Sequence, residues 1–185
     1  MLEGVIFDVT ERVHNEEMVK REAHYDHMTG MLRRAPAKIQ FESYLAQSPA
    51  ANVCFLLLDL DGFKLINDSY GHHAGDQVLS IIAERLFKCV RASDIVCRLG
   101  GDEFLIILMS DQGANFKSEI ANKVLASISL PISLDTDELV SVGASIGITD
   151  FRLSNSKNFE VLIKDADKAM YQVKNDGKNN YQVKA

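Results

Sequence analysis

Two acidic residues follow a pair of glycines near the middle of the chain, in the run Arg98–Phe104 (RLGGDEF). Strand-like apolar segments flank the glycines, so the run predicts a hairpin whose two-residue turn is the glycine pair, because glycine accepts the positive φ angles of such turns. Asp102 and Glu103 then leave the turn side by side. Carboxylates at the start of a buried strand need a cation or a proton donor beside them, so the run predicts a functional site.

Two more acids, Asp59 and Asp61, lie at the end of an apolar strand predicted over residues 53–60 and directly after it. Clustered carboxylates repel one another unless cations offset their charge. Oxygen ligands without histidine or cysteine favour Mg²⁺ or Mn²⁺ over zinc. Two such ions can clamp the attacking and leaving oxygens of a phosphoryl or nucleotidyl transfer. The alternatives are a calcium-like structural site or a solvated acidic rim. A rim does not need three of its acids on central strands, so the catalytic interpretation is favoured.

The segment between residues 61 and 76 offers groups that fit a nucleotide. Lys64 can meet a phosphate as a point charge. Asn67 and Asp76 can read a purine edge, because a carboxylate accepts from the paired N–H groups that guanine presents and adenine lacks. Standing alone, each of these residues would be better explained by turn making or helix capping. The chain has no GxxxxGK[ST] run, which excludes a P-loop protein.

Two further pairs of charged residues are less specific. Arg91 and Asp94, taken alone, are explained by a surface ion pair, which is worth at most ~1 kcal/mol. Lys174 and Lys178 lie about one turn apart at the end of the last predicted helix, and they are either solvated charges or phosphate contacts.

Hydrophobic periodicity predicts the elements that carry these residues. A strand end at residues 4–7 and a charged helix to about residue 25 come first, and the thin apolar stripe of that helix favours a stalk or pairing helix. The remaining predicted elements are helix 35–46, strand 53–60, helix 76–90, strand 95–99, strand 103–109, helix 116–128, a half-buried strand at 142–148, helix 159–173 and strand 181–183. This order predicts an α+β fold with a ferredoxin-like, palm-type βαββαβ core, a mostly antiparallel central sheet flanked by helices, and an N-terminal linker helix.

The predicted order of strands brings the acids together. In a split βαβ unit, strand 103–109 lies between strands 53–60 and 95–99 and runs antiparallel to both. The two acids that end the first of these strands therefore lie beside the two that follow the glycine turn.

The composition indicates one soluble globular domain with a short appendage, at 185 residues with 46% hydrophobic and 25% charged residues. The net charge of −6 argues against nucleic-acid binding and is compatible with divalent cations. The longest apolar run, Val53–Leu58, is too short to span a bilayer, so no direct membrane contact is expected, and no signal peptide is visible. Cys54, Cys89 and Cys97 lack metal-site or redox spacing, which favours reduced core thiols and a cytoplasmic location.

Together these residues resemble the GGDEF family, the diguanylate cyclases of bacterial signalling. The resemblance covers about residues 22–183 and rests on several separated motifs. These motifs are Asp26-x-x-Thr-Gly30, the segment Asp59–Asp76, Arg98–Phe104, Ala144-Ser-Ile-Gly147, and Ala166-Asp-x-Ala-Met-Tyr171 with Lys174. The resemblance implies an enzyme that condenses two GTP into cyclic di-GMP and two pyrophosphates. Each 3′-hydroxyl would attack the α-phosphate of the other GTP across a twofold homodimer.

The resemblance also implies roles for individual residues. Asp59 and Asp102 would ligate Mg²⁺ or Mn²⁺, and the Leu60 carbonyl would assist. Glu103 would act at the same metal site, in deprotonating or positioning the 3′-hydroxyl.

Substrate and product contacts follow from the same resemblance. The guanine contacts would be Asn67 and Asp76. The triphosphate contacts would be Lys64, Lys174 and Lys178, with Gly100 and Gly101 allowing close approach of the backbone. The motif for product inhibition by cyclic di-GMP would be Arg91 and Asp94.

Gly4–Arg12 resembles the last strand and exit motif of a PAS sensor domain. Residues 1–25 are therefore predicted to be the end of an upstream sensor and a dimerising linker helix, and residues 26–185 the cyclase domain. Two positions depart from the family pattern: Arg33 stands where asparagine is usual, and Lys178 where arginine is more common. Neither change strikes the predicted metal site, so activity is expected to survive.

Three functions are compared. The favoured one is a metal-dependent cyclase with product inhibition. The second is a catalytically silent domain that binds GTP or cyclic di-GMP, against which the intact set of Asp59, Asp102 and Glu103 counts. The third is a dimerisation element with a vestigial site, which a lack of GTP binding would be needed to support.

Overall fold

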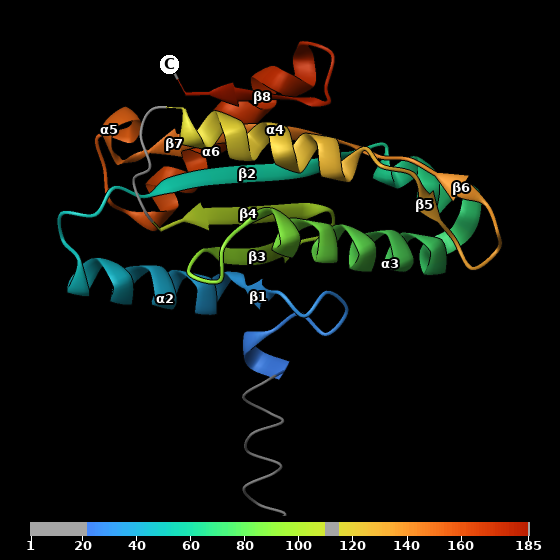
Figure 1. Cartoon of the computed structure of the whole chain (residues 1–185), viewed down its shortest axis with the longest axis horizontal. Coiled ribbons are helices and arrows are strands. Elements are labelled where there is room, and N and C mark those ends of the chain that lie inside the picture. The colour runs from blue at the N-terminus through green and yellow to red at the C-terminus, as the bar shows by residue number, and fades with distance from the viewer. Residues whose placement is uncertain (1–21, 110–114, 185) are drawn as a thin grey trace, which may run out of the picture.

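The structure, a computed structural model, describes residues 22–109 and 115–184 of the chain. Its elements, labelled as in Figure 1, are β1 (Leu32–Arg33), α2 (Arg34–Gln47), β2 (Cys54–Asp61), α3 (Phe63–Cys89), β3 (Ile95–Gly100), β4 (Glu103–Leu108), α4 (Phe116–Ile128), β5 (Ile132–Ser133), β6 (Leu139–Val140), β7 (Gly143–Asp150), α5 (Phe151–Ser154), α6 (Phe159–Asn175) and β8 (Asn180–Val183). The run β2-α3-β3-β4-α4-β7 is the predicted βαββαβ core, and α6 and β8 follow it.

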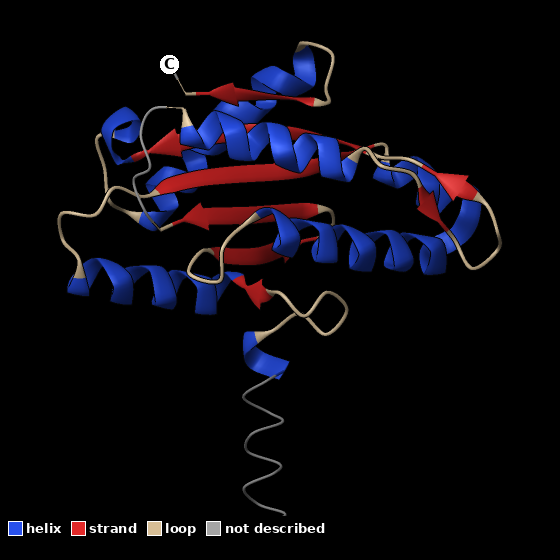
Figure 2. Cartoon of the chain, in the orientation of Figure 1, coloured by secondary structure: helices blue, strands red, loops and turns tan. Residues whose placement is uncertain are grey.

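A six-stranded sheet in the order β1-β3-β4-β2-β7-β8 forms the middle layer. Helices pack on both of its faces (Figures 1 and 2). Leu56 and Leu58 of β2 join the buried cluster with α3 and α4, whereas Phe55 packs with α2 and α6 and Leu57 with α6. Alternate residues of a strand face opposite sides of a sheet, so odd-numbered positions of β2 face α6. This alternation decides where the acids of β2 lie.

The predicted strand topology is confirmed. Strand β4 lies between β2 and β3 and is antiparallel to both. In this register Asp59 of β2 stands directly opposite Glu103 of β4. Strand β7 pairs with the other edge of β2 and places Ser145 opposite Asp59. The sheet therefore brings the end of β2 beside the glycine turn, as the order of elements predicted.

Helix α3 begins much earlier than expected. The sequence predicted a helix from residue 76 and a loop before it, but α3 starts at Phe63 and is interrupted at Gly71, where φ is 83° and ψ is 165°. Phe63 and Ile66 are buried, so one short helical face packs against the core ahead of the kink. The loop prediction was wrong because the glycine break made the whole segment look irregular.

The glycine turn is shifted by one residue from its predicted place. Gly100 ends β3 and pairs with Glu103, so the two turn residues are Gly101 and Asp102. The ladder slips between Arg98 and Gly100, and such a bulge adds one residue to a strand. Both glycines have positive φ angles, 154° and 52°. Asp102 consequently lies in the turn itself and Glu103 begins the strand.

Strand β7 is buried on both faces, so the prediction of a half-buried strand was wrong. Ala144, Ile146 and Ile148 belong to the cluster under α3 and α4, and Ser145 and Thr149 on the other face are also inaccessible to solvent. The small and polar residues that suggested an exposed face lie under α6 instead.

Some elements had no sequence signal, and some predictions fall on residues that the structure does not describe. The two-residue strands β1, β5 and β6 are too short to show a period. The strand end at residues 4–7 and nearly all of the predicted linker helix lie outside the described residues, although residues 22–24 are helical. Within the described part of the chain, no helix is both long and apolar enough to cross a bilayer.

The three cysteines are free thiols, and Cys89 and Cys97 are buried. Burial raises the pKa of the Cys54 and Cys97 thiols to about 12, so neither provides a reactive thiolate near neutral pH. This agrees with the prediction of reduced core residues.

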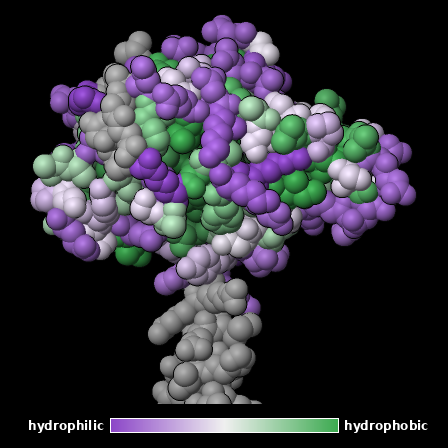
Figure 3. All heavy atoms as spheres, viewed as in Figure 1, coloured by the Kyte–Doolittle hydropathy of each residue, from purple (hydrophilic) through white to green (hydrophobic). Residues whose placement is uncertain are grey.

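On the face shown in Figure 3 hydrophilic residues cover most of the surface, and hydrophobic residues appear in smaller patches between them.

Candidate active site

Asp59 and Glu103 form the centre of the site, as cross-strand neighbours on β2 and β4. Both lie on the face that α6 covers. Lys174, in the last turn of α6, reaches them from that helix, and its Nζ is 2.7 Å from Asp59 Oδ2. The structure thus brings together a predicted metal ligand, the predicted catalytic glutamate and a predicted phosphate contact.

Negative charge is disfavoured at this centre. Burial raises the pKa of Asp59 above its ordinary value, and the charges of Asp102 and Asp61 act in the same direction while Lys174 opposes them. Burial also raises the pKa of Glu103, and Asp59 adds to that effect. A cation placed between such carboxylates relieves both causes.

The donor atoms available at the centre are all oxygens. The predicted ligands are the carboxylates of Asp59, Asp102 and Glu103 and the Leu60 carbonyl, and an oxygen set of this kind would fit Mg²⁺ or Mn²⁺. Among the described residues, however, no three His, Cys, Asp or Glu side chains converge closely enough to hold a metal ion as they stand. The expectation that topology alone assembles four carboxylates was therefore too strong. In this arrangement the Lys174 ammonium partly neutralises the negative charge of the centre through its ion pair with Asp59.

Backbone contacts fix the turn that carries Asp102. The Leu60 N–H donates to the Asp102 carbonyl oxygen at 3.3 Å, which ties the end of β2 to the turn. Arg98 Nε and Nη2 donate to the Gly101 carbonyl oxygen at 3.0 and 2.7 Å. The Arg98 guanidinium therefore holds the backbone of the turn at Gly101 and limits the movement of the next residue, Asp102.

Arg98 also connects the turn to the start of the domain. Its Nη1 donates to Asp26 Oδ1 at 3.0 Å, and the two side chains are only 11% and 15% exposed. The same Asp26 oxygen accepts the Thr29 backbone N–H at 3.0 Å and the Thr29 hydroxyl at 2.7 Å. The sequence predicted no individual role for this Asp-x-x-Thr motif or for Arg98. The Asp-x-x-Thr spacing is typical of a turn capped by an aspartate, and this was the sequence signal from which a structural role of Asp26 could have been predicted.

The predicted guanine contacts lie on either side of the kink in α3. Asn67 precedes it and Asp76 follows it, and the kink brings Gly75 back against the Asn67 side chain. A Cβ atom at Gly75 would lie 2.0 Å from Asn67 Oδ1, so only glycine leaves this amide in place. Lys64 is exposed on the same short helix, one turn before Asn67. The structure therefore brings Asn67 against Gly75, the residue before Asp76.

Both carboxylate oxygens of Asp61 accept hydrogen bonds from neighbouring protein groups. Its two carboxylate oxygens accept the Ser145 hydroxyl at 2.9 and 3.1 Å, and Oδ2 also accepts the Asn179 N–H at 2.9 Å. Lys178, the residue before Asn179, is exposed in the turn after α6. Asp61 was predicted to be one of four converging acids, but its hydrogen bonds go to β7 and to the turn that leads into β8.

The predicted product-inhibition pair lies at the opposite end of β3 from the glycine turn. Asp94 Oδ2 accepts the Arg91 N–H at 2.9 Å and Oδ1 accepts the Met109 N–H at 3.0 Å, so this carboxylate closes the loop before β3. The Arg91 guanidinium lies 5.3 Å from the centre of the Phe116 ring and is exposed. The pair is therefore not the simple side-chain ion pair that sequence alone suggests.

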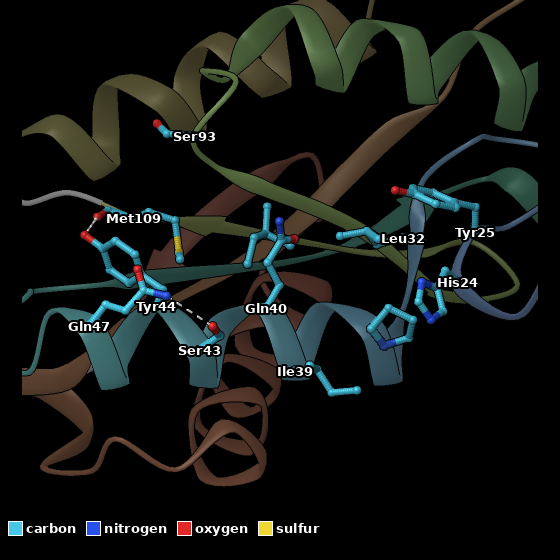
Figure 4. A pocket seen from close by; sticks show the side chains of 12 residues that line it. His24, Tyr25, Leu32, Ile39, Gln40, Ser43, Tyr44, Gln47, Ser93 and Met109 are labelled. Carbon is cyan, nitrogen blue, oxygen red and sulfur yellow. Dashed lines mark hydrogen bonds between the residues drawn. The ribbon is translucent and has the colours of Figure 1, made fainter. Parts of the chain in front are cut away.

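Two hollows adjoin these motifs, and neither contains the central carboxylates. One, of about 520 Å³, runs along α2, and its lining residues include Ser93 and Ile95, which flank Asp94. Figure 4 shows another lining residue, Tyr44, with its hydroxyl bonded to the Met109 carbonyl oxygen. The other, of about 340 Å³, adjoins the glycine turn, and Arg33 is among its lining residues. The Arg33 Nε donates to the Tyr25 carbonyl oxygen at 3.0 Å.

The match to a known family is decisive. The sequence model described as "Diguanylate cyclase, GGDEF domain" matches residues 23–180. The chain belongs to the GGDEF domain family. The solved GGDEF domain of TpbB (YfiN) from Pseudomonas aeruginosa PAO1 is 35% identical and superposes with a TM-score of 0.82, covering 88% of this chain and 95% of that one. The fold described above is thus that of a GGDEF domain.

Curated relatives of this GGDEF domain are longer proteins. The cyclic di-GMP phosphodiesterase PdeB of Shewanella oneidensis is 33% identical over 179 residues, which cover 97% of this chain and 20% of PdeB. The bifunctional diguanylate cyclase/cyclic di-GMP phosphodiesterase MucR of P. aeruginosa is 37% identical over 169 residues, which cover 90% of this chain and 24% of MucR. The chain therefore spans about a fifth to a quarter of the length of these two relatives.

Proposed function

We propose that this GGDEF domain is an active diguanylate cyclase. It condenses two GTP molecules into cyclic di-GMP and releases two pyrophosphates. The observation that carries the proposal is the pairing of Asp59 with Glu103 across β2 and β4, with the Lys174 ammonium 2.7 Å from Asp59. Acids that are held close together against their own repulsion, beside a lysine and a tight glycine turn, form a site for a metal-bound polyphosphate.

The metal would be Mg²⁺ or Mn²⁺, held by Asp59, Asp102, Glu103 and the Leu60 carbonyl. When bound, the ion supplies neutralisation of the triphosphate charge and orientation of the reacting oxygens. Lys174 is then free to exchange its contact with Asp59 for a phosphate oxygen. Glu103 lies at the mouth of the site and holds or accepts the proton of the attacking 3′-hydroxyl.

Each turnover forms two phosphodiester bonds. A 3′-oxygen attacks the α-phosphorus of the facing GTP, the bond from that phosphorus to the bridging oxygen breaks, and pyrophosphate leaves. Asn67 and Asp76 hold the guanine, while Lys64, Lys174 and Lys178 contact the phosphates with Gly100 and Gly101 beside them. One domain holds one GTP, so two domains must meet in a twofold homodimer, and catalysis is largely positioning and charge neutralisation.

The same proposal extends to the arrangement of the whole protein. Residues 1–25 are the end of a PAS-like sensor and a linker helix that brings two cyclase domains together, and residues 26–185 are the cyclase domain in the cytoplasm. The Asp26–Arg98 contact would connect the first residues after such a linker to the turn that carries Asp102.

A silent GTP- or cyclic di-GMP-binding domain is the second candidate. PdeB supports it, because a protein named as a phosphodiesterase contains a segment that is 33% identical to this chain. Such a segment need not catalyse synthesis in its own protein.

Incubation of the purified chain with GTP and Mg²⁺ at high protein concentration distinguishes the two. We expect cyclic di-GMP, identified by chromatography and mass, with none formed by the Asp102→Ala variant. Bound GTP without product from a confirmed dimer would identify the silent domain. A monomeric preparation is tested again after fusion of a dimeric coiled coil to its N-terminus, and a fused dimer without product would contradict the cyclase.

Product inhibition at Arg91 and Asp94 gives a separate prediction. Arg91→Ala should raise the cyclic di-GMP concentration needed for half-inhibition at least tenfold, since a bidentate arginine contact to phosphate or guanine is lost. The uninhibited rate should stay within about twofold, because the pair lies at the far end of β3 from the glycine turn. Arg91 is the better position to change, because Asp94 accepts two backbone N–H groups and its loss would disturb the fold. Unchanged inhibition in Arg91→Ala would remove these residues from the inhibitory site.

A further inference from the structure

The turn between α6 and β8 has an unfavourable backbone conformation. Gly177, Lys178 and Asn179 have φ angles of 113°, 65° and 45°, so three successive residues lie at positive φ and two of them are not glycine. Side chains with a Cβ atom rarely adopt this region, and they keep it only where surrounding contacts determine it. The turn therefore needs stabilising contacts, or anchors, from neighbouring residues.

Asp61 is one of these anchors. Its Oδ2 accepts the Asn179 N–H at 2.9 Å, and the Ser145 hydroxyl donates to both oxygens of the carboxylate at 2.9 and 3.1 Å. A carboxylate that accepts a backbone N–H makes a stronger bond than a neutral acceptor does. From the other side, the Lys178 N–H donates to the Val173 carbonyl oxygen at 3.0 Å. Lys178 is thus fixed between the end of α6 and the end of β2.

The Asn179 side chain is confined as well. A Cβ atom at Gly143 would lie 3.0 Å from Asn179 Oδ1, and the Ser129 hydroxyl approaches that oxygen at 3.4 Å. Gly143 is the residue of β7 paired with Asp61, so the same strand end contacts Asn179 through its backbone and its side chain. Lys178, between Gly177 and Asn179 in this turn, has an exposed side chain.

We infer that Asp61 is a positioning residue for the phosphate contact of Lys178, and that it does not ligate the metal. The inference rests on the proposed function, because it assigns Asp61 to the GTP site of the cyclase. The Asp61 carboxylate binds the backbone N–H of Asn179, and this bond stabilises the turn of positive φ angles. The turn then directs the Lys178 ammonium towards the triphosphate. This explains why a second aspartate follows Asp59 on the same face of β2 while both of its oxygens are already engaged.

The test compares Asp61→Ala with the isosteric Asp61→Asn, which keeps an oxygen that can accept the Asn179 N–H. Calorimetry with Mg²⁺ and α,β-methylene-GTP should show that Asp61→Ala raises Kd about tenfold, as Lys178→Ala does, and Asp61→Asn no more than about threefold. The double variant Asp61→Ala/Lys178→Ala should be no worse than Lys178→Ala alone, because both changes remove one contact. The Mg²⁺ concentration at half-saturation should not change in Asp61→Asn.

Hydrogen exchange of the Asn179 amide provides a readout that needs no nucleotide. Exchange should be faster in Asp61→Ala and close to wild type in Asp61→Asn, with thermal unfolding confirming that both variants fold. Equal Kd values for the wild type and Asp61→Ala, or a raised Mg²⁺ requirement in Asp61→Asn, would overturn the inference. A wild type that does not bind the analogue would overturn the proposed function, and the exchange data would then still decide whether Asp61 anchors the turn.

Discussion

Asp59→Asn should lower the rate of cyclic di-GMP formation by about 10³-fold, the scale expected when charge stabilisation of a phosphoryl transfer is lost. An amide at this position keeps the shape of the side chain and removes the negative charge that the ion requires. It also removes the partner of Lys174, so the lysine no longer has a carboxylate to hold it between turnovers. Initial rates at saturating GTP and a series of Mg²⁺ concentrations provide the measurement.

The same substitution should leave the metal-free protein at least as stable as the wild type. Burial raises the pKa of Asp59 in the folded protein, so the ionised carboxylate is disfavoured there relative to the unfolded chain. Its cost to stability is absent at low pH, appears as the pH rises through the carboxyl range, and is complete at neutral pH. Asparagine removes that cost, and thermal unfolding at pH 4 and pH 7 should show a larger advantage of Asp59→Asn at the higher value.

Asp167→Asn is the matched control for these measurements. Asp167 is exposed on α6, and its charge reaches Glu103 without being part of the oxygen set. We expect this control to form cyclic di-GMP within about twofold of the wild-type rate. A similar loss in both variants would mean that general charge around Glu103, and no ligand role of Asp59, controls turnover. Full activity of Asp59→Asn would contradict the metal assignment outright.

The meeting of Asp59 and Glu103 was predictable because it depends on strand order alone. The apolar runs before Asp59 and after Glu103 identify two strands, and the split βαβ order places one antiparallel beside the other. The exact register, with Asp59 opposite Glu103, comes from the structure, because the glycine turn joins β3 to β4 and does not connect either strand to β2. No side-chain detail was needed for this part of the site.

Side-chain partners were not predictable in the same way. The period of a strand shows that Asp61 shares a face with Asp59, but it does not show that the Ser145 hydroxyl and the Asn179 N–H already occupy its oxygens. These partners come from β7 and from the turn after α6, far away in the sequence. The same holds for Arg98 and Asp26, which lie 72 positions apart. Long-range polar contacts of this kind leave no periodic signal.

Local conformation set a second limit. The bulge before Gly100 moved the turn by one residue, and the kink at Gly71 made a helical segment look like a loop. In both places a glycine allowed a backbone conformation that composition alone does not distinguish from a simple turn. The fold class survived these errors because each of them is confined to one end of an element.

Gly147→Ala should destabilise the domain by at least about 3 kcal/mol, because overpacking against backbone cannot relax by rotating a side chain. A Cβ atom on Gly147 would lie 1.9 Å from the Ala166 carbonyl oxygen and 2.5 Å from the Met170 nitrogen, both in the backbone of α6. Helix α6 would have to move away from β7. Since α6 carries Lys174 to the Asp59 carboxylate, the site should open as the fold weakens.

Gly143→Ala in the same strand is the matched control, because the three atoms nearest its added Cβ all belong to the Asn179 side chain, the closest at 3.0 Å. We expect Gly147→Ala to lower Tm by about 10 °C and Gly143→Ala to cost less than about 1 kcal/mol, since a side chain can shift by a few tenths of an ångström. Chemical denaturation and calorimetry of both variants provide the comparison. Equal stability of the two would show that α6 does not pack on β7 through Gly147, and the placement of Lys174 over Asp59 would lose its structural basis.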